Sequence, residues 1–452
     1  MAGKLNLPKS VNIILDLFSK KGYEIYIVGG AVRDLLMGKM VSDWDFTTNA
    51  NPEQIIEILP KNAFYGNVFG TVMLPVTDVE SPFDITTFRT ESGYSDARRP
   101  DKVTWGKSLK EDLQRRDFTI NAMALKNANS EIIDSFGGQK DLKKKQIKAV
   151  GDPRARFSED ALRMLRAIRI AGELKFKIDP KTLLAIKEFS PLINRIAKER
   201  VKEELFKILS SSNPYQGFVL LKDSNLMDEI LPEFAKTFGV EQKSPGRHHI
   251  YDVGTHSLYS LKQVAIKNQN PIVRFATLIH DIGKPLTYKK LDNGTITFYN
   301  HEVVGARIAK RIAERLHFST KEKDKLWKLV RHHQFSVTEK QTDKAIRRFI
   351  KNVGIENIKD MLDLRTGDRL GGGASETSWR TEEFKKRLIE VQKQPFSLRD
   401  LKINGEDIMN ELKIKPGPQI GKLLGKLFSE VQDNKLPNNK KALLKKLKEI
   451  SI

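Results

Sequence analysis

The chain has 452 residues, and its 79 Lys and Arg against 57 Asp and Glu give a formal net charge of +22. The length predicts more than one domain, and the charge indicates a polyanionic partner, although a generally lysine-rich composition would produce the same balance. The lack of cysteine excludes disulfides and thiolate zinc sites. Without a secretory signal or an apolar run near the roughly 20 residues of a membrane span, we expect a cytoplasmic protein with no membrane partner.

The first 150 residues alternate strand-like and helix-like patterns. Strand-like runs rich in β-branched and aromatic residues cover 25–28, 45–47, 71–76, 84–89 and 132–134. From about residue 151 helical periodicity dominates, and the Asp-Pro and Ser-Pro pairs at 179–180 and 190–191 predict helix starts. Three glycines at 371–373 predict a linker. The pattern is that of an α/β head followed by an all-helical neck and body.

Two glycines after the first strand carry the strongest local signal. Gly29 and Gly30 would let the backbone approach a ligand closely, and the residues after them open a helix whose amide groups attract phosphate. Asp43 and Asp45 follow two residues apart, so on a strand they face one side and can share metal ions. A phosphate cradle beside paired carboxylates predicts nucleotidyl transfer, although an isolated Asp-x-Asp fits a solvated turn equally well.

Asp84 lies in the strand-like run 84–89 and is the candidate third carboxylate of a two-metal site. One ion there would lower the pKa of an attacking 3′-hydroxyl, and the other would stabilise the leaving pyrophosphate. A single aspartate on a strand can also be an ordinary surface residue.

Arginines follow in two places. Arg115 and Arg116 begin a segment suited to phosphate recognition, because a guanidinium donates two hydrogen bonds at once, but a salt-bridged surface turn is an equal alternative. A second set recurs every third residue and predicts one polar stripe along a helix: Asp160, Arg163, Arg166 and Arg169. An aspartate and an arginine one turn apart can read a base edge, or can simply form an intrahelical ion pair.

These ordered motifs resemble the superfamily of class II tRNA nucleotidyltransferases and bacterial poly(A) polymerases, and most of all its CCA-adding members. The resemblance covers about 180 residues and continues through Asp134–Gly138 and Glu199–Leu205. It implies a DNA polymerase β-like head that adds C, C and A to the 3′ end of tRNA from CTP and ATP. The segment 89–100 resembles a flexible loop that CC-adding enzymes lack. A poly(A) polymerase that adds ATP-only tails is the alternative, and full CCA addition is not separated from A-only addition.

The resemblance also implies roles for single residues. The implied roles are triphosphate binding by Gly30 and Arg33, magnesium binding by Asp43 and Asp45, nucleotide contact by Arg116, base pairing by Asp160 and Arg163, and support of the base pocket by Arg166 and Arg169.

A second constellation follows the neck. His280-Asp281 ends an apolar run and, with His256 on a preceding helix, can bind a divalent metal through imidazole nitrogen and carboxylate oxygen. The pattern resembles an HD phosphohydrolase domain, with possible phosphatase or cyclic phosphodiesterase activity on RNA 3′ ends and a metal that the sequence does not identify. The resemblance implies these ligands: His256, His280, Asp281, His301, His332 and Asp368, with His333 as the alternative to His332.

We therefore predict a nucleotidyltransferase head (1–150), a helical neck and RNA-binding region (151–245), an HD domain (246–370) and a basic tRNA-binding tail (371–452). Lysines of the tail, including 440–448, can meet tRNA phosphates or form a solvated helical face. An HD hydrolase with a degenerate head would leave the aspartate pair without a purpose, and a non-catalytic RNA-binding protein would explain only the charge. The oligomeric state is not predicted.

Overall fold

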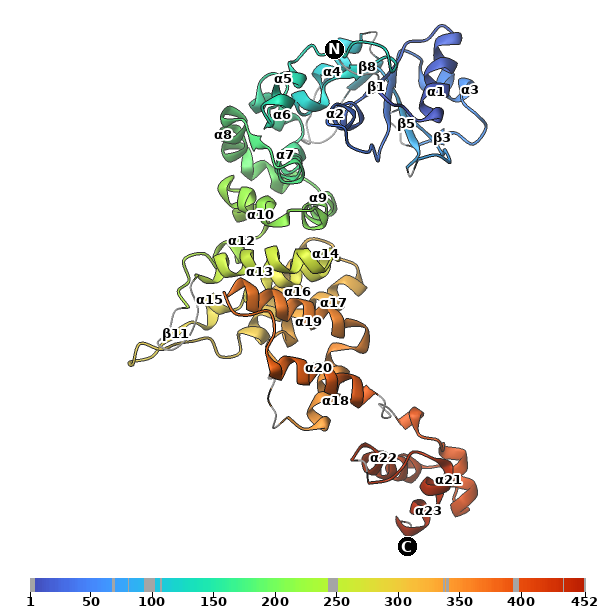
Figure 1. The fold of residues 1–452 in the computed structure, drawn as a ribbon, viewed down its shortest axis with the longest axis vertical. Helices are drawn as coiled ribbons and strands as arrows, with labels where there is room; N and C mark the ends of the chain where they lie inside the picture. Colours follow the sequence, from blue (N-terminus) through green and yellow to red (C-terminus); the bar gives the residue numbers. More distant parts are fainter. Residues whose placement is uncertain are drawn as a thin grey trace.

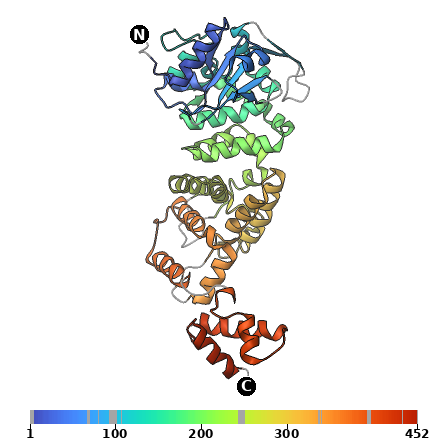
Figure 2. The same cartoon turned by 90° about the vertical axis from the view of Figure 1, so that its right-hand side faces the viewer.

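The structure is a computed structural model. It describes residues 5–66, 70–79, 81–92, 102–105, 108–242, 251–335, 338, 341–392, 398–433 and 435–450, with the backbone alone at 90–92 and 102–105. The molecule is elongated, with a mixed α/β head at one end, layers of helices below it and a small helical unit at the C-terminal end (Figures 1 and 2).

The head contains a six-stranded sheet in the order β3-β4-β5-β2-β1-β8. Its strands are β1 (Ile25–Val28), β2 (Asp45–Thr48), β3 (Phe64–Tyr65), β4 (Thr71–Leu74), β5 (Phe83–Thr87) and β8 (Ala124–Leu125). Strands β2 and β5 are parallel, whereas β1 is antiparallel to both β2 and β8. A separate antiparallel pair consists of β6 (Arg89–Ser92) and β7 (Lys102–Trp105). The helices of the head are α1 (Lys9–Lys20), α2 (Gly30–Leu36), α3 (Pro52–Ile58), α4 (Leu109–Gln114), the 3₁₀ turn η1 (Thr119–Asn121) and α5 (Gly138–Lys143).

Most predicted strands are present, with two exceptions. The predicted run 84–89 is divided, because β5 ends at Thr87 and Arg89 begins β6. The predicted strand 132–134 is wrong as a strand, since among the described residues it forms only an isolated bridge between Ile133 and Ala124.

Below the head, the neck is helical. Its elements are α6 (Pro153–Glu159), α7 (Leu162–Leu174), α8 (Pro180–Phe189), η2 (Ser190–Arg195), α9 (Lys198–Ser210), α10 (Pro214–Asp223), α11 (Leu226–Ile230) and α12 (Pro232–Ala235), with the short parallel pair β9 (Gln146–Ile147) and β10 (Lys177–Ile178). Helix α8 begins as predicted, because the Asp179 carboxylate accepts hydrogen bonds from the amides of Lys181 and Thr182. The segment after Ser190 is a 3₁₀ helix instead of the predicted α-helix.

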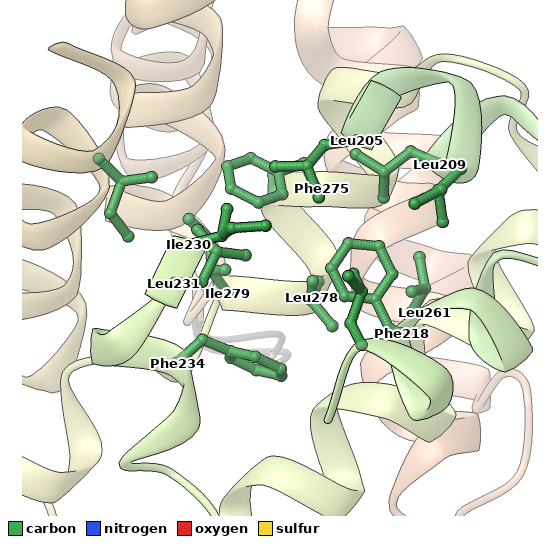
Figure 3. Packing of buried hydrophobic residues seen from close by; sticks show 14 of the residues in the cluster. Leu205, Leu209, Phe218, Ile230, Leu231, Phe234, Leu261, Phe275, Leu278 and Ile279 are labelled. Carbon is green, nitrogen blue, oxygen red and sulfur yellow. The ribbon is translucent and has the colours of Figure 1, made fainter. Parts of the chain in front are cut away.

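The body continues the same stack. It consists of α13 (Val253–Lys267), α14 (Pro271–Ile279), α15 (Lys284–Thr287), the hairpin β11 (Lys289–Lys290) and β12 (Ile296–Thr297), α16 (His301–Arg315), α17 (Thr320–His332), α18 (Asp343–Val353), η3 (Ile355–Asn357), α19 (Ile358–Gly371) and α20 (Trp379–Gln392). Figure 3 shows Leu205, Phe218 and Phe234 of the neck packed against Leu261, Phe275 and Leu278 of the body. One buried apolar cluster therefore joins neck and body.

This packing moves two of the expected domain boundaries. Phe118, Ile120 and Ile147 lie in the neck and body core although they precede residue 150. Phe384, Leu388 and Val391 of α20 lie in the same core, so the structural break falls after α20 and not at the glycines 371–373, where α19 ends. The C-terminal unit has its own core and consists of η4 (Leu398–Asp400), α21 (Gly405–Leu412), α22 (Pro418–Gln432) and α23 (Lys440–Ile450). Among the described residues, no helix combines the length and apolar character needed to cross a bilayer.

Candidate active site and metal cluster

The first glycine of the motif is required by close packing. Gly29 has φ 74°, and a Cβ there would lie 3.0 Å from Asp45 Oδ2 and 3.1 Å from Arg116 Nη1. This backbone conformation is strained for L-residues with a side chain. Gly29 thus lets an aspartate of β2 and an arginine of the segment after α4 meet at the start of α2.

Two of the three candidate carboxylates lie side by side on parallel strands. The register of β2 and β5 pairs Asp45 with Asp84. Burial, together with the nearby Asp84 and Asp43 carboxylates, raises the pKa of Asp45 to about 6 in spite of the opposing charge of Arg116. Burial and Asp43 also raise the pKa of Asp84, whose Oδ1 is buried without a hydrogen-bond partner in the described part of the chain. A cluster of carboxylates that resist ionisation together is suited to bind a divalent cation.

Asp43 differs from Asp45 in its surroundings. It is exposed in the loop before β2, and the buried Trp44 separates the two aspartates. The alternation expected of a strand therefore holds, although β2 itself begins only at Asp45.

A chain of polar contacts connects α2 with the neck helix α7. Arg33 Nη1 donates to Asn121 Oδ1 at 2.9 Å, and Asn121 Nδ2 donates to Asp117 Oδ1 at 3.1 Å. Arg166 donates to Asp117 Oδ2 through Nε at 2.8 Å and Nη2 at 2.7 Å. Although burial opposes ionisation, Arg166 lowers the pKa of Asp117 to about 2. The contacts fix the positions of Arg33 and Arg166 relative to each other.

These arginines and the aspartates line a cleft of about 500 Å³ between the head and α7. The predicted residues on its wall are Gly30, Arg33, Asp43, Asp45, Arg166 and Arg169. Residues that the sequence did not point to line it as well: Asp34, Lys39, Met40, Ser42, Asn121, Ile170, Glu173 and Leu174. A cleft with carboxylates on one side and arginines on the other has the charge pattern that a nucleoside triphosphate with a divalent cation requires.

The predicted base-reading pair lies outside this wall, and the predicted helical stripe is wrong at its first member. Asp160 has an extended backbone between α6 and α7, so it is not on the helix. Its carboxylate accepts a hydrogen bond from the Leu162 amide and lies 3.6 Å from Arg200. Arg163 donates to Glu159 at 2.8 Å and to the Arg115 carbonyl at 2.9 Å. The alternative of an Asp160–Arg163 ion pair is therefore also not observed.

Arg115 and Arg116 are held by an aspartate that the sequence did not single out. The fully buried Asp112 accepts hydrogen bonds from Arg115 Nη2 at 2.8 Å and from Arg116 Nη2 at 3.2 Å. Its spacing three and four residues before the arginines on α4 was a usable signal. The predicted residues Tyr94, Asp96 and Arg98 to Pro100 lie outside the described residues.

The second constellation forms one buried cluster in the body. His256 of α13 and His280 at the end of α14 approach through their Nε2 atoms to 3.4 Å, and His256 Nε2 lies 3.1 Å from Asp368 Oδ1 of α19. Asp281 Oδ2 lies 3.2 Å from His280 Nε2 and 3.7 Å from His256 Nε2. These four residues offer the histidine and carboxylate atoms of one metal site.

Asp281 also belongs to a second group. Its Oδ1 lies 3.2 Å from His301 Nε2 and 3.6 Å from His333 Nε2, and these two nitrogens are 3.3 Å apart. Each carboxylate oxygen of Asp281 thus faces a different set of histidines. The arrangement fits two divalent ions bridged by one aspartate.

Hydrogen bonds orient three of the histidines. The Nδ1 atoms of His280, His301 and His333 lie 2.7–2.8 Å from the carbonyl oxygens of Thr277, Phe298 and Val330, respectively. A donor role for Nδ1 leaves the Nε2 lone pair free for a metal. The chemistry of this donor set therefore fits a divalent cation.

The predicted ligand His332 is corrected to His333. His332 is half-buried and lies edge-on to Trp327 with ring centroids 5.9 Å apart, away from the cluster. Adjacent residues at a helix end project in different directions, and here it is His333 that turns inward.

The carboxylates of this cluster are ionised. Although burial disfavours charge, His280 and Lys284 hold the pKa of Asp281 well below its ordinary value, and hydrogen bonds with His256 and His280 do the same for Asp368. Lys284 Nζ lies 2.6 Å from Asp281 Oδ2, a contact that the sequence did not indicate. Metal ligands must be deprotonated, so this state suits binding.

Comparisons with known proteins agree with the head motif. Three family descriptions match: Poly A polymerase head domain (25–148), Probable RNA and SrmB-binding site of polymerase A (175–238) and tRNA nucleotidyltransferase domain 2 putative (299–447). A CCA-adding enzyme of Limosilactobacillus reuteri (strain DSM 20016) is 36% identical over 445 residues, which are 97% of this chain and 96% of the relative.

Solved structures are similar along the whole chain. The Bacillus stearothermophilus CCA-adding enzyme in complex with CTP aligns with TM-score 0.69 and 26% identity over 98% of both chains. The Thermotoga maritima CCA-adding enzyme complexed with tRNA(CCA) aligns with TM-score 0.59 and 21% identity over 99% of this chain and 97% of that one, a likeness of fold.

Proposed function

The chain belongs to the family of CCA-adding enzymes, which are tRNA nucleotidyltransferases, and we propose that it adds C, C and A to the 3′ end of tRNA from CTP and ATP. No nucleic-acid template is needed. The observation that carries the proposal is the register of Asp45 and Asp84 at a cleft whose opposite wall holds Arg33 and Arg166. We expect the chain to act in the cytoplasm, where tRNA, CTP and ATP occur together.

In this reaction the terminal 3′-oxygen of tRNA attacks the α-phosphorus, the bond from that phosphorus to the bridging oxygen breaks, and pyrophosphate leaves. Magnesium held by Asp43 and Asp45, with Asp84 beside them, would make the hydroxyl a better nucleophile and offset the charge of the leaving pyrophosphate. Arg33 and Arg166 donate to the triphosphate oxygens, and their mutual connection through Asp117 keeps them in place.

Base selection by Asp160 and Arg163 is the part of the proposal that needs movement. Arg163 would have to exchange its hydrogen bonds to Glu159 and the Arg115 carbonyl for a base edge. Asp160 has no donor closer than the Leu162 amide at 3.0 Å, so its outer oxygen can accept from an exocyclic amino group.

The test is incorporation into tRNA that lacks its 3′ end, with CTP and ATP offered singly and together and products resolved to one nucleotide. Three additions followed by a stop support the proposal, and unlimited adenylation favours the poly(A) alternative. The double variant Asp43→Ala/Asp45→Ala should lose incorporation. Asp34→Asn, which changes a neighbouring cleft carboxylate, is the matched control and should retain part of the activity.

The buried cluster of the body supports a second function. We propose that it hydrolyses phosphate esters, either monoesters or 2′,3′-cyclic diesters of RNA ends, with two divalent ions bridged by Asp281. Such ions would activate water for attack on phosphorus while the bond to the ester oxygen breaks. In the protein itself, Lys284 holds Asp281, and the backbone carbonyls hold the histidines.

The hydrolase test separates the two sites. Purified chain should bind divalent metal, measured by elemental analysis after dialysis, and should release phosphate or open cyclic phosphates. His280→Gln should lose both the metal and the hydrolysis but keep CCA addition, whereas Asp43→Ala/Asp45→Ala should do the opposite. Loss of both activities in either variant would contradict two independent sites.

A further inference from the structure

The hairpin between the two halves of the metal cluster has no role in the functions proposed so far. It consists of residues 288–299, and we call it the 288–299 hairpin. It leaves the body shortly after Asp281 and Lys284 and returns immediately before His301, and it projects from the helical stack (Figure 1). The two sides of the cluster are therefore also the two ends of this hairpin.

The base of the hairpin contacts the cluster directly. The Phe298 carbonyl oxygen lies 2.8 Å from Nδ1 of His301, and Lys284 Nζ lies 5.3 Å from the centre of the Phe298 ring. Tyr288 packs against Phe298 with ring centroids 5.8 Å apart. Tyr299 is two residues from His301, so its backbone lies within roughly 7 Å of that ligand's backbone.

The surface of the hairpin is apolar and basic. Tyr299 is 77% exposed, and Leu286 just before the hairpin is 71% exposed. Lys289 and Lys290 of β11 are exposed as well, and Asp292 is the only acidic residue in the sequence between Lys284 and His301. Exposed aromatic rings beside cations at the edge of a phosphoester site indicate a binding surface.

We propose that the 288–299 hairpin holds the last nucleotides of a single-stranded RNA whose 3′-terminal phosphate enters the metal cluster. This inference rests on the proposed hydrolase. A base can stack on Tyr299, since every base has a π-face, and Lys289 and Lys290 can meet phosphates further along the strand. A free mononucleotide would reach the cluster without using these lysines, so the proposal makes the RNA chain, and not the terminal nucleotide alone, the preferred substrate.

The test compares two substrates that present the same bond. One is a hexaribonucleotide with a 2′,3′-cyclic phosphate end, and the other is 2′,3′-cyclic AMP. Tyr299→Ala should raise KM for the hexanucleotide roughly tenfold, with kcat and the hydrolysis of cyclic AMP nearly unchanged. Tyr299→Phe keeps the ring and should behave like the unaltered chain. Tyr65→Ala, which removes a 55% exposed tyrosine of the head, is the matched control.

Equal KM values for the hexanucleotide in the unaltered chain and Tyr299→Ala would overturn the proposal, as would an equal rise for both substrates. A second readout does not need hydrolysis. A 3′-phosphorylated oligonucleotide with 4-thiouridine next to its last nucleotide should photocrosslink to residues 288–299, and Tyr299→Ala should weaken this crosslink.

Crosslinks confined to the head and the tail would overturn the proposal and leave the hairpin as a surface for a protein partner. If the chain hydrolyses neither substrate, the hydrolase proposal fails, and the crosslink alone decides whether the hairpin binds RNA.

Discussion

The ion pair of Asp117 and Arg166 joins the head to the neck helix, and its removal tests how much this junction depends on it. Asp117 is 8% exposed and accepts hydrogen bonds from the Phe118 amide, Asn121 and Arg166. Asp117→Asn keeps the size of the side chain but removes its charge. It leaves Arg166 beside a neutral amide, and one of the two oxygens that accepted hydrogen bonds becomes a donor.

The magnitude follows from the pKa of Asp117. A decrease from the ordinary 3.8 to about 2 corresponds to roughly 2.5 kcal/mol of stabilisation at pH 7, at about 1.4 kcal/mol for each tenfold change in the acid constant. The Arg166 side chain is 38% exposed, so solvent screens part of the attraction. We therefore expect a loss of about 2 kcal/mol, below the roughly 3–5 kcal/mol typical of broken fully buried pairs.

The pH dependence has a definite sign. Because the pKa is lower in the folded chain, the carboxylate stabilises the fold above pH 3.8, and this contribution disappears as the pH falls through about 2. Urea unfolding of the unaltered chain and Asp117→Asn should differ by about 2 kcal/mol at pH 7 and by about half of that near pH 3. Asp16→Asn, at an exposed position of α1, is the control. Equal stabilities at pH 7, or a difference that does not change with pH, would refute this reasoning.

Three further predictions concern the two sites. Gly29→Ala should reduce CCA incorporation at least about a hundredfold, because its Cβ would displace Asp45 and Arg116; near-normal activity would show that the close approach is dispensable. The affinity of the head for magnesium, measured by calorimetry, should fall as the pH drops below about 6, where Asp45 takes up a proton, and an unchanged affinity at pH 5 would contradict the raised pKa. His333→Gln should halve the divalent metal retained after dialysis while His332→Gln leaves it unchanged, and the reverse result would restore the original ligand assignment.

Local motifs predicted the head well because their chemistry and their geometry coincide. A Gly-Gly pair after a buried strand has few uses other than a close backbone approach, and the φ of 74° at Gly29 agrees with this. The pairing of Asp45 with Asp84 could be anticipated only as a neighbouring strand, since register depends on contacts between residues far apart in sequence.

The errors arose where tertiary contacts override local periodicity. A spacing of three residues predicted that Asp160 begins the polar stripe of a helix, but the chain turns there, and Arg200 from a later helix takes the place of the intrahelical partner. The choice between His332 and His333 depended on where α17 ends, and a shift of one residue rotates a side chain by about 100°.

The distribution of buried residues explains why the segment 115–124 cannot be interpreted as a ligand-contact motif alone. Phe118 and Ile120 anchor it in the core of the neck and body, whereas Met123 belongs to the core of the head. Between these anchors, Asn121 reaches Arg33 in the head, and Asp117 reaches Arg166 in the neck. The same ten residues therefore place Arg116 at the carboxylates and fix the distance between the two walls of the cleft. A substitution in this segment can thus change nucleotide binding through the relative position of head and neck, without touching the nucleotide.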